Sequence, residues 1–265
     1  MKNLKTIFIC LFALLMVTSC KKQVAETDVV SNGVQEPHLK YSLVTLVPTS
    51  SFSSFSTYWN YNYPWGTDHN GSARMRSSQV TTSGGVLTCT SVPGTASDKA
   101  SIHYYSGTVY AKQQVTVSDA WPLWRVSGEF QCRSVKGTWP AFWLNSAIGW
   151  PPESDIMEFK GSATCWQNTY YNLSSAWSSV GSAVTTPTNW HTYTAWIAKN
   201  SSTNVKIEYW IDGVLKTTQY GLNFMNVPLN LIIDYQMEGS SGTPGPTGTT
   251  VMNARNVTIQ RSATL

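Results

Sequence analysis

Residues 151–161 read "PPESDIMEFKG", a run that alternates like a β-strand and yet carries three carboxylates. Side chains of a strand point alternately to its two faces, so Glu153 and Asp155 share a face while Glu158 has the opposite parity. One inserted residue would return Glu158 to the face of the other two. The spacing therefore raises the question of whether this strand is regular.

A β-bulge at Ile156 and Met157 would supply the inserted residue, because two residues there would oppose one on the neighbouring strand. Bulges are common next to active sites, where they re-aim a side chain. The spacing alone leaves other interpretations open, since three acids within six positions also suit a solvated strand face or a Ca²⁺ site. No grouping of Cys and His has zinc-site spacing, and we expect no metal ligands.

The rest of the chain favours an all-β domain. Short segments rich in Val, Thr, Tyr, Trp and Ile are separated by turn residues such as Asp212-Gly213, which suits a tight hairpin. The expected strands include 86–92, 107–117, 122–135, 139–146, 154–161, 190–199, 205–213, 227–237 and 251–261. Because no stretch of ten residues has the pattern of an amphipathic helix, this spacing predicts a two-sheet antiparallel sandwich.

The composition is that of a secreted β protein. Charged residues make up 12% of the 265 residues, about half the usual share, and the chain has 12 Trp, 13 Tyr and 8 Phe. The formal net charge of +4 falls by two if Lys2 and Lys5 leave with an N-terminal signal. Nothing in this balance favours nucleic acid as a partner.

The N-terminus, "MKNLKTIFICLFALLMVTSC", has a basic start and an apolar run that is too short to span a membrane comfortably. Its end, "VTSC", resembles the bacterial lipobox, whose Cys becomes the lipidated first residue of the mature protein. Ordinary cleavage near Ser19 is the alternative. We predict a lipoprotein signal peptide over residues 1–19, lipidation of Cys20, and a tether over residues 20–50 that leads into the first strand.

The remaining residues, 51–265, form a single predicted domain. After loss of the signal and lipidation, only Cys89, Cys132 and Cys165 remain unmodified. An odd number permits at most one disulfide and defines no disulfide framework.

The longer stretch "GTWPAFWLNSAIGWPPESDIMEFKG", residues 137–161, resembles the signature region of glycoside hydrolase family 16. Members of that family carry a Glu-x-Asp-x-(x)-Glu strand after G-x-W-P-A-x-W. "YYSGTVYA", "WHTYTAWIAK", "KIEYWIDGV" and "ARNVTIQR" follow the family's order, so the resemblance spans about residues 80–261. It implies a jelly-roll sandwich of the concanavalin A-like lectin and glucanase type.

Carried over to this chain, the resemblance makes Glu153 the nucleophile, Glu158 the general acid/base and Asp155 their orienting partner. Cleavage of a glycosidic bond needs one ionised and one protonated carboxyl, and repulsion among three close acids separates their pKa values. Two Glu side chains leaning inward along a bulged strand would bring their carboxyls to roughly 5 to 6 Å, the separation of retaining enzymes. We expect Asp155 to hydrogen-bond the nucleophile.

Aromatic side chains are expected to form the sugar platform. Trp143 and Trp150 would stack on the apolar faces of hexose rings, with core packing as the alternative for each. Trp59 and Trp65, in "YWNYNYPWG", are expected to line the far end of the cleft.

Polar side chains from other strands would complete the site. The family pattern places Asp234 where members usually have an Asn facing the cleft, and strand alternation puts Gln236 on the same face. Either would hydrogen-bond a sugar hydroxyl. His191 on a strand is more often structural, and Ser154 would face the sandwich interior and need a hydrogen-bond partner.

These observations predict a lipid-anchored, secreted, retaining endo-β-glycanase. Its substrate would be a β-1,3- or mixed-linkage glucan, or a galactan such as agar, porphyran or carrageenan, and the fold does not choose among them. A carbohydrate-binding lectin and a transglycosylase are the alternatives. No cofactor is required, the sequence does not support a structural Ca²⁺, and we expect a monomer held by Cys20 at the bacterial cell envelope, on the outer membrane or cell surface.

Overall fold

The computed structural model describes residue 36, residues 41–170 and residues 177–265. The chain divides into two compact units, Met1–Asn32 and Gly33–Leu265, and every described residue lies in the second. The predicted signal peptide and Cys20 lie outside the described residues. Helices in the described part are single turns: η1 (Ser51–Ser54), α1 (Phe55–Tyr58), η2 (Ser77–Gln79) and η3 (Gly239–Ser241). None of these turns has the length and apolar character needed to cross a bilayer.

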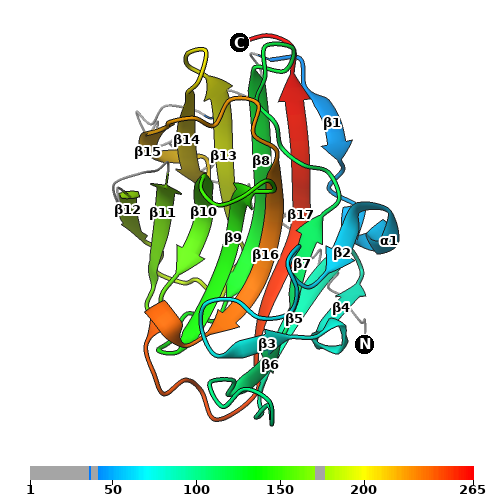
Figure 1. Cartoon of the computed structure of the whole chain (residues 1–265), viewed down its shortest axis with the longest axis vertical. Helices are drawn as coiled ribbons and strands as arrows, with labels where there is room; N and C mark the ends of the chain where they lie inside the picture. The colour runs from blue at the N-terminus through cyan, green and yellow to red at the C-terminus, as the bar shows by residue number, and fades with distance from the viewer. Residues whose placement is uncertain (1–35, 37–40, 171–176) are drawn as a thin grey trace, which may run out of the picture. The chain divides into compact units, whose positions relative to one another are not determined.

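One sheet has seven strands and carries the acid-rich segment (Figure 1). All its neighbouring strands pair antiparallel. In spatial order they are β12 (Trp177–Ala183), β11 (Thr164–Tyr170), β10 (Glu153–Phe159), β9 (Thr138–Ser146), β16 (Leu229–Met237), β7 (Thr108–Ala111) and β2 (Trp59–Tyr61). The acid-rich strand β10 therefore lies inside the sheet, between β9 and β11.

The second sheet has ten strands. Its main path is β15 (Val214–Gly221), β14 (Val205–Ile211), β13 (His191–Lys199), β8 (Leu123–Cys132), β17 (Thr250–Ser262), β5 (Val86–Pro93), β6 (Tyr104–Ser106) and β3 (Ala73–Met75). Two further strands pair off this path, β1 (Val44–Val47) with β17 and β4 (Val80–Ser83) with β5. Its pairs are antiparallel except β3 with β6, which is parallel.

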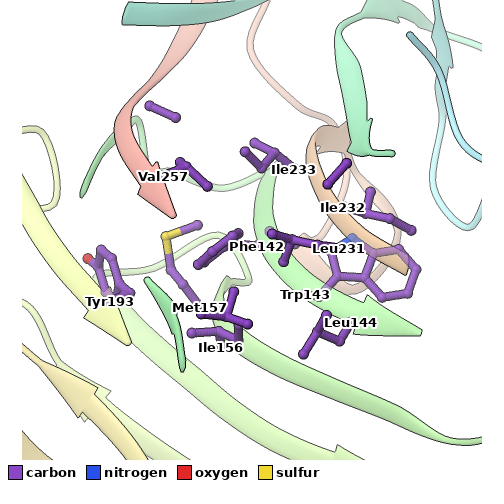
Figure 2. Packing of buried hydrophobic residues seen from close by; sticks show 14 of the residues in the cluster. Phe142, Trp143, Leu144, Ile156, Met157, Tyr193, Leu231, Ile232, Ile233 and Val257 are labelled. Carbon is purple, nitrogen blue, oxygen red and sulfur yellow. The ribbon is translucent and has the colours of Figure 1, made fainter. Parts of the chain in front are cut away.

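The core fills the space between the two sheets. Phe142 and Met157 of the seven-stranded sheet pack in one cluster with Tyr193 and Val257 of the other (Figure 2). The Phe142 ring lies 4.8 Å from that of Phe130 on β8. Full burial of such a side chain contributes roughly 1.5–3 kcal/mol. The predicted two-sheet jelly-roll sandwich is thus confirmed.

Most expected strands are present within a few residues of their predicted ends, but several regions differ. The segment 107–117 is a strand only as far as Ala111, because Val115 makes a single bridge to Leu229. Strands β11 and β12 were not predicted: β11 is rich in Gln, Asn and Thr, and β12 in Ser. On β11 the polar side chains of Gln167 and Thr169 are fully buried in the sandwich, and β12 has no buried residue, so both strands lack the apolar alternation that identifies a strand.

The sandwich begins before the predicted boundary at residue 51. Strand β1 lies within the segment 20–50 that was interpreted as a tether, and it pairs with the final strand β17. Val47 at its end is fully buried in the core. The domain therefore includes at least residues from Val44 onward.

Cys89, Cys132 and Cys165 are all free and buried. Burial raises the pKa of each thiol above its usual range. The three side chains act as small apolar members of the core cluster.

Candidate active site

The predicted bulge is present on β10. On β9, Trp143 faces Asp155 and the next residue, Phe142, faces Met157, which leaves Ile156 as the extra residue. The register against β11 shifts over the same interval. Ile156 and Met157 are both fully buried in the core, and the three carboxylates of the strand all line one cleft. The bulge thus places all three acids on one face of the strand, which regular alternation would not do.

Ser154 lies between two of these acids and points into the sandwich. Its hydroxyl is 2.6 Å from the hydroxyl of Tyr209 on β14. A buried hydroxyl without a partner would cost about 1–3 kcal/mol. The expected partner for Ser154 is therefore present, and it comes from the opposite sheet.

The cleft has a volume of about 900 Å³ and lies over β9, β10, β11, β12 and β16. Loops around residues 64–70, 145–150 and 240 complete its walls. Its lining is mainly aromatic and polar: Pro64, Trp65, His69, Asn70, Trp139, Ala141, Trp143, Asn145, Ser146, Ala147, Gly149, Trp150, Glu153, Asp155, Glu158, Lys160, Asn168, Trp177, Ser179, Asn230, Asp234, Gln236 and Ser240.

The two glutamates each accept a hydrogen bond from an indole. Trp150 Nε1 donates to Glu153 Oε2 at 2.9 Å, and Trp139 Nε1 donates to Glu158 Oε1 at 2.6 Å. Lys160 also contacts Glu158, with its Nζ 2.8 Å from Oε2. These donors hold both carboxyl groups in fixed orientations at the floor of the cleft.

Asn168 on β11 connects two of the acids. Its Nδ2 donates to Asp155 Oδ2 and to Glu158 Oε2, both at 2.8 Å. The Ser179 hydroxyl donates to its Oδ1, which fixes the amide so that its N–H groups face the carboxyls. The hydrogen bond expected between Asp155 and Glu153 is thus replaced by a bridge from Asp155 to Glu158. The reason is that Asn168 stands directly opposite Asp155 in the β10–β11 register.

Burial raises the pKa of two of the acids, Glu153 and Asp155. It raises the pKa of Glu153 to about 7, against the hydrogen bond from Trp150, and the charge of Glu158 adds to the rise. The pKa of Asp155 lies well above its usual range, first through burial and then through repulsion by Glu158 and Glu153. Glu153 and Asp155 therefore hold their protons more tightly than ordinary carboxyls do.

A fourth carboxyl, that of Asp234, lies on β16 in the wall of the cleft. Burial raises its pKa to about 7, although hydrogen bonds from Tyr63 and Trp143 oppose the rise. The Tyr63 hydroxyl donates to Oδ2 at 2.6 Å and Trp143 Nε1 donates to Oδ1 at 3.0 Å. Asp234 therefore holds two aromatic side chains in place.

Gln236 also lines the cleft, as expected from strand alternation. Its Oε1, however, accepts hydrogen bonds from the backbone N–H groups of Ala73 at 2.8 Å and Met237 at 2.9 Å. These bonds anchor β16 to β3.

The aromatic side chains form two groups on the cleft wall. Near Asp234, the ring of Trp65 stacks on Tyr63 at 5.0 Å, and His69 stacks on Trp143 at 5.6 Å. Trp65 is 45% exposed, so its ring is available to a ligand. Trp143 is almost fully buried yet still lines the cleft.

The second aromatic group lies beside Glu153. Trp150 is 54% exposed and stacks on Tyr170 at 4.4 Å, with the two rings nearly parallel. Trp177 lies 4.6 Å from Tyr170 and is 45% exposed. Together these rings form a continuous apolar strip next to the acids.

The placement of Trp59 in the cleft was wrong. Its side chain is 1% exposed and packs in the core, where its ring lies 5.0 Å from that of Phe52. Nε1 donates to Ser51 Oγ at 3.1 Å. Trp59 begins β2 at the sheet edge, and its side chain points into the core, which the aromatic composition of this segment could not indicate.

The cleft residues that sequence reasoning missed include Trp139, Lys160, Asn168 and Trp177. Trp139 shares parity with Trp143 on β9, and Lys160 follows Glu158 by two positions, so alternation could have identified both. Asn168 and Trp177 lie on the unpredicted strands β11 and β12, where no sequence signal marked them.

Two further expectations concern metal and histidine. In the part of the chain that the structure describes, no group of three or more His, Cys, Asp or Glu side chains is arranged to hold a metal ion. His191 lies on β13, in the other sheet, where Nδ1 is 2.7 Å from Asp212 Oδ2 and Nε2 is 2.9 Å from the Thr186 carbonyl. Its role is structural.

An open cleft walled by aromatic rings, with two glutamates on a single strand at its floor, defines a class of protein. Aromatic rings stack on the apolar faces of sugars, and paired carboxyls cleave glycosidic bonds. The class is that of glycoside hydrolases acting on a polysaccharide.

Comparison with known proteins narrows the class to a family, although no protein-family model matches the sequence. A galactan endo-β-1,3-galactanase from Flammulina velutipes is 46% identical over 227 residues, which cover 82% of this chain and 90% of that relative. An endo-1,3-1,4-β-glycanase from Rhizobium meliloti (strain 1021) is 28% identical over 170 residues, covering 60% of this chain and 34% of that relative. The chain thus spans about a third of the length of this second relative.

Solved structures share the fold. The catalytic domain of an endo-1,3-β-glucanase (laminarinase) from Thermotoga petrophila RKU-1 has a TM-score of 0.66 at 18% identity and covers 86% of this chain and 99% of its own. A non-specific endo-β-1,3(4)-glucanase from family GH16 has a TM-score of 0.67 at 18% identity, covering 87% and 97%. The chain belongs to glycoside hydrolase family 16. It is an endo-β-glycanase, and retention of anomeric configuration is general to the family.

Proposed function

We propose that this enzyme hydrolyses internal bonds of a neutral β-1,3-linked galactan, with Glu153 as nucleophile and Glu158 as general acid/base. The observation that carries the proposal is the bulged strand β10, which places both glutamates and Asp155 in one cleft. The name of the Flammulina velutipes relative supports galactan over glucan.

In the first step, a Glu153 carboxylate oxygen forms a bond to the anomeric carbon as the bond to the leaving oxygen breaks. Glu158 gives its proton to that oxygen. In the second step, Glu158 takes a proton from water, the water oxygen bonds to the anomeric carbon, and the ester bond to Glu153 breaks. The Trp150 N–H favours the ionised nucleophile, because it donates to a Glu153 oxygen.

Asp155 and Asn168 act on the acid/base in this proposal. Asn168 Nδ2 bridges Asp155 and Glu158, so it holds the Glu158 carboxyl at a fixed angle to the strand. The exposed rings of Trp150 and Trp65 would stack on sugar rings. Trp143, which is almost fully buried beneath His69 and held by Asp234, would support the cleft wall instead of stacking on a sugar. The Gln236 side-chain oxygen already accepts hydrogen bonds from backbone N–H groups. Gln236 would therefore shape the wall of the cleft.

The charge of the cleft favours a neutral polysaccharide over a sulfated one. Four carboxyls line it, from Glu153, Asp155, Glu158 and Asp234, while Lys160 is its single Lys or Arg among the described residues. The Lys160 ammonium is already paired with Glu158. Sulfate groups of porphyran or carrageenan would meet this negative charge without a free cation to bind them.

A polysaccharide panel tests the proposal. The enzyme should release oligosaccharides of mixed size from β-1,3-galactan and be slower on laminarin, mixed-linkage glucan and agarose, with porphyran and carrageenan slowest. Turnover of laminarin without turnover of β-1,3-galactan would contradict the substrate assignment. Sizing of the products over time also separates hydrolysis from transglycosylation, because sugar transfer yields products longer than the starting oligosaccharide.

The N-terminal pattern supports a lipid anchor at Cys20 and a place on the bacterial outer membrane or cell surface. Cys20→Ala should move the enzyme from the membrane fraction to the soluble fraction, because lipid would be its anchor once the signal is removed. Mass spectrometry of the mature N-terminus is the direct check, and an unmodified Ser or Lys there would contradict the proposal. The enzyme would act as a monomer, which light scattering of the purified protein would verify.

A further inference from the structure

Glu238 is a buried carboxylate at the end of β16, next to the cleft but outside its lining. Its backbone has φ 56° and ψ −136°, a conformation that L side chains rarely adopt. Such a residue costs on the order of 1–3 kcal/mol and persists only where its surroundings hold it. The contacts of Glu238 show what holds it.

The Glu238 carboxylate fastens the loop that follows it. Oε1 accepts from Thr243 Oγ1 at 3.0 Å and from the Gly245 N–H at 2.9 Å, and Oε2 lies 2.7 Å from His103 Nδ1. Burial opposes its charge, but hydrogen bonds from Ser72, His103, Gly245 and Thr243 lower the pKa of Glu238 to about 2. It is therefore ionised throughout the range in which a glycanase works.

The loop that follows Glu238 lies directly against the indole of Trp139. A Cβ atom added to Gly239 would lie 2.6 Å from Cζ3 of the Trp139 indole and 3.1 Å from the Gly71 Cα. No other residue fits there, because carbon atoms do not approach so closely. The Glu238 N–H also donates to the Gly137 carbonyl at 3.0 Å, which fixes the loop to the start of β9.

Trp139 in turn contacts the acid/base, because its Nε1 donates to Glu158 Oε1 at 2.6 Å. When Glu158 gives up its proton, this N–H faces the oxygen atoms on which negative charge develops. A fixed donor of this kind acts only if the indole cannot turn away.

We propose that Glu238 is a positioning residue for catalysis, which holds Gly239 against Trp139 and so keeps the indole N–H on Glu158. The inference rests on the acid/base role proposed for Glu158. It assigns a function to the strained backbone of Glu238 and to the glycine that follows it.

The first test replaces Glu238 in the whole enzyme and separates kcat from KM. Glu238→Ala should lower kcat roughly ten-fold, the effect of about one lost hydrogen bond, while KM changes by less than about three-fold because the sugar platforms remain. The matched control is Glu129→Ala, since Glu129 accepts from Arg255 on the ten-stranded sheet. The control should leave kcat unchanged.

A double-mutant cycle with Trp139→Phe separates positioning from a general loss of stability. Phe keeps a ring against Gly239 but has no N–H to donate. If Glu238 acts through Trp139, the double variant should lose little more kcat than Trp139→Phe alone. If the two losses of kcat multiply in the double variant, the inference is wrong. If Glu238→Ala does not fold, His103→Ala replaces it in the cycle, because His103 is half exposed and removes one clamp only.

Failure of the positioning role can be distinguished from failure of the proposed function. Glu158→Gln tests the acid/base role directly. If Glu158→Gln abolishes turnover while Glu238→Ala folds and keeps wild-type kcat, the positioning role is wrong and the acid/base role stands. If Glu158→Gln retains wild-type turnover, the proposed function itself is wrong.

Discussion

At the scale of single residues, the chemistry depends on the different contacts that each glutamate of β10 makes in the cleft. Glu153 accepts from Trp150, whereas Glu158 accepts from Trp139, Asn168 and Lys160. These different surroundings allow two glutamates on one strand to take different roles.

Glu153→Gln and Glu158→Gln should each lower kcat by roughly a thousand-fold or more, because each removes a group that forms or breaks a bond in the reaction. Asp155→Asn should be milder, since Asp155 reaches the acid/base only through Asn168. Steady-state kinetics and thermal melts of all three variants provide the measurement. Near wild-type turnover in both Glu variants on the true substrate would refute the assignment.

Asp234 makes stability depend on pH. Its pKa rises on folding from an ordinary value near 3.8 to about 7, so between those values the folded state binds a proton that the unfolded state has lost. The free energy of unfolding contributed by this group is therefore highest at low pH and falls as pH rises through about 4 to 7.

Asp234→Asn should flatten this part of the pH dependence. Asn can accept from Trp143 through its oxygen and donate to the Tyr63 hydroxyl through its nitrogen, so the contacts survive without a titrating group. Denaturant unfolding at pH 4 and pH 8 is the measurement, with Asp98→Asn, at an exposed site, as control. A variant that loses as much stability as wild type between the two pH values would show that Asp234 is not the group responsible.

The sequence could predict the bulge, because the spacing of the three acids conflicts with strand alternation, whereas the catalytic roles of these acids came from the resemblance of residues 137–161 to family 16. It could not predict Trp59, whose inward orientation depends on the phase of a three-residue edge strand. Parity assigns side chains to two faces, but it does not say which face of an isolated short strand meets the core.

At the scale of secondary-structure elements, the site depends on β11 as much as on β10. Strand β11 brings Asn168 opposite Asp155, and β12 brings Ser179 opposite Asn168. Neither strand was predicted, because the buried polar residues Gln167 and Thr169 of β11 make hydrogen bonds instead of apolar contacts, and β12 buries no residue. Polar strands of this kind carry no alternation of apolar residues from which a sequence prediction could start.

Asn168→Ala should lower kcat roughly ten- to a hundred-fold, because it removes one donor shared by Asp155 and Glu158 and leaves like charges without a bridge. Asn253→Ala is the matched control, since Asn253 hydrogen-bonds Thr88 and Gln131 on the other sheet. The measurement is the kcat of Asn168→Ala and of Asn253→Ala at the same pH. Equal activity of the two would argue against a role for β11 in catalysis.

At the scale of the whole molecule, the sandwich is closed by its first and last strands. Strand β1 pairs with β17, and Val47 enters the core. The sequence placed this segment in a tether because one short strand after a polar stretch shows no periodicity of its own. Its structure depends on β17, more than 200 residues away in the chain.

A chain beginning at residue 52 should therefore melt lower than one beginning at residue 33, by roughly 4–12 °C. Loss of the β1 pairing and of buried Val47 removes roughly 2–3 kcal/mol, and each kcal/mol shifts Tm by about 2–4 °C in a domain of this size. Thermal unfolding followed by circular dichroism measures the difference. Equal melting temperatures would mean that β1 contributes nothing to the stability of the sandwich.

The central claim is that one bulged strand presents a nucleophile and an acid/base to the same sugar, and the stereochemistry of the first product tests it most directly. If the two glutamates converge to roughly 5 to 6 Å, no water fits between Glu153 and the anomeric carbon, and a covalent glycosyl-Glu153 forms. Proton NMR of products from β-1,3-galactan, recorded before mutarotation, should then show the β-anomer first. Initial accumulation of the α-anomer would contradict both the geometry and the roles assigned to Glu153 and Glu158.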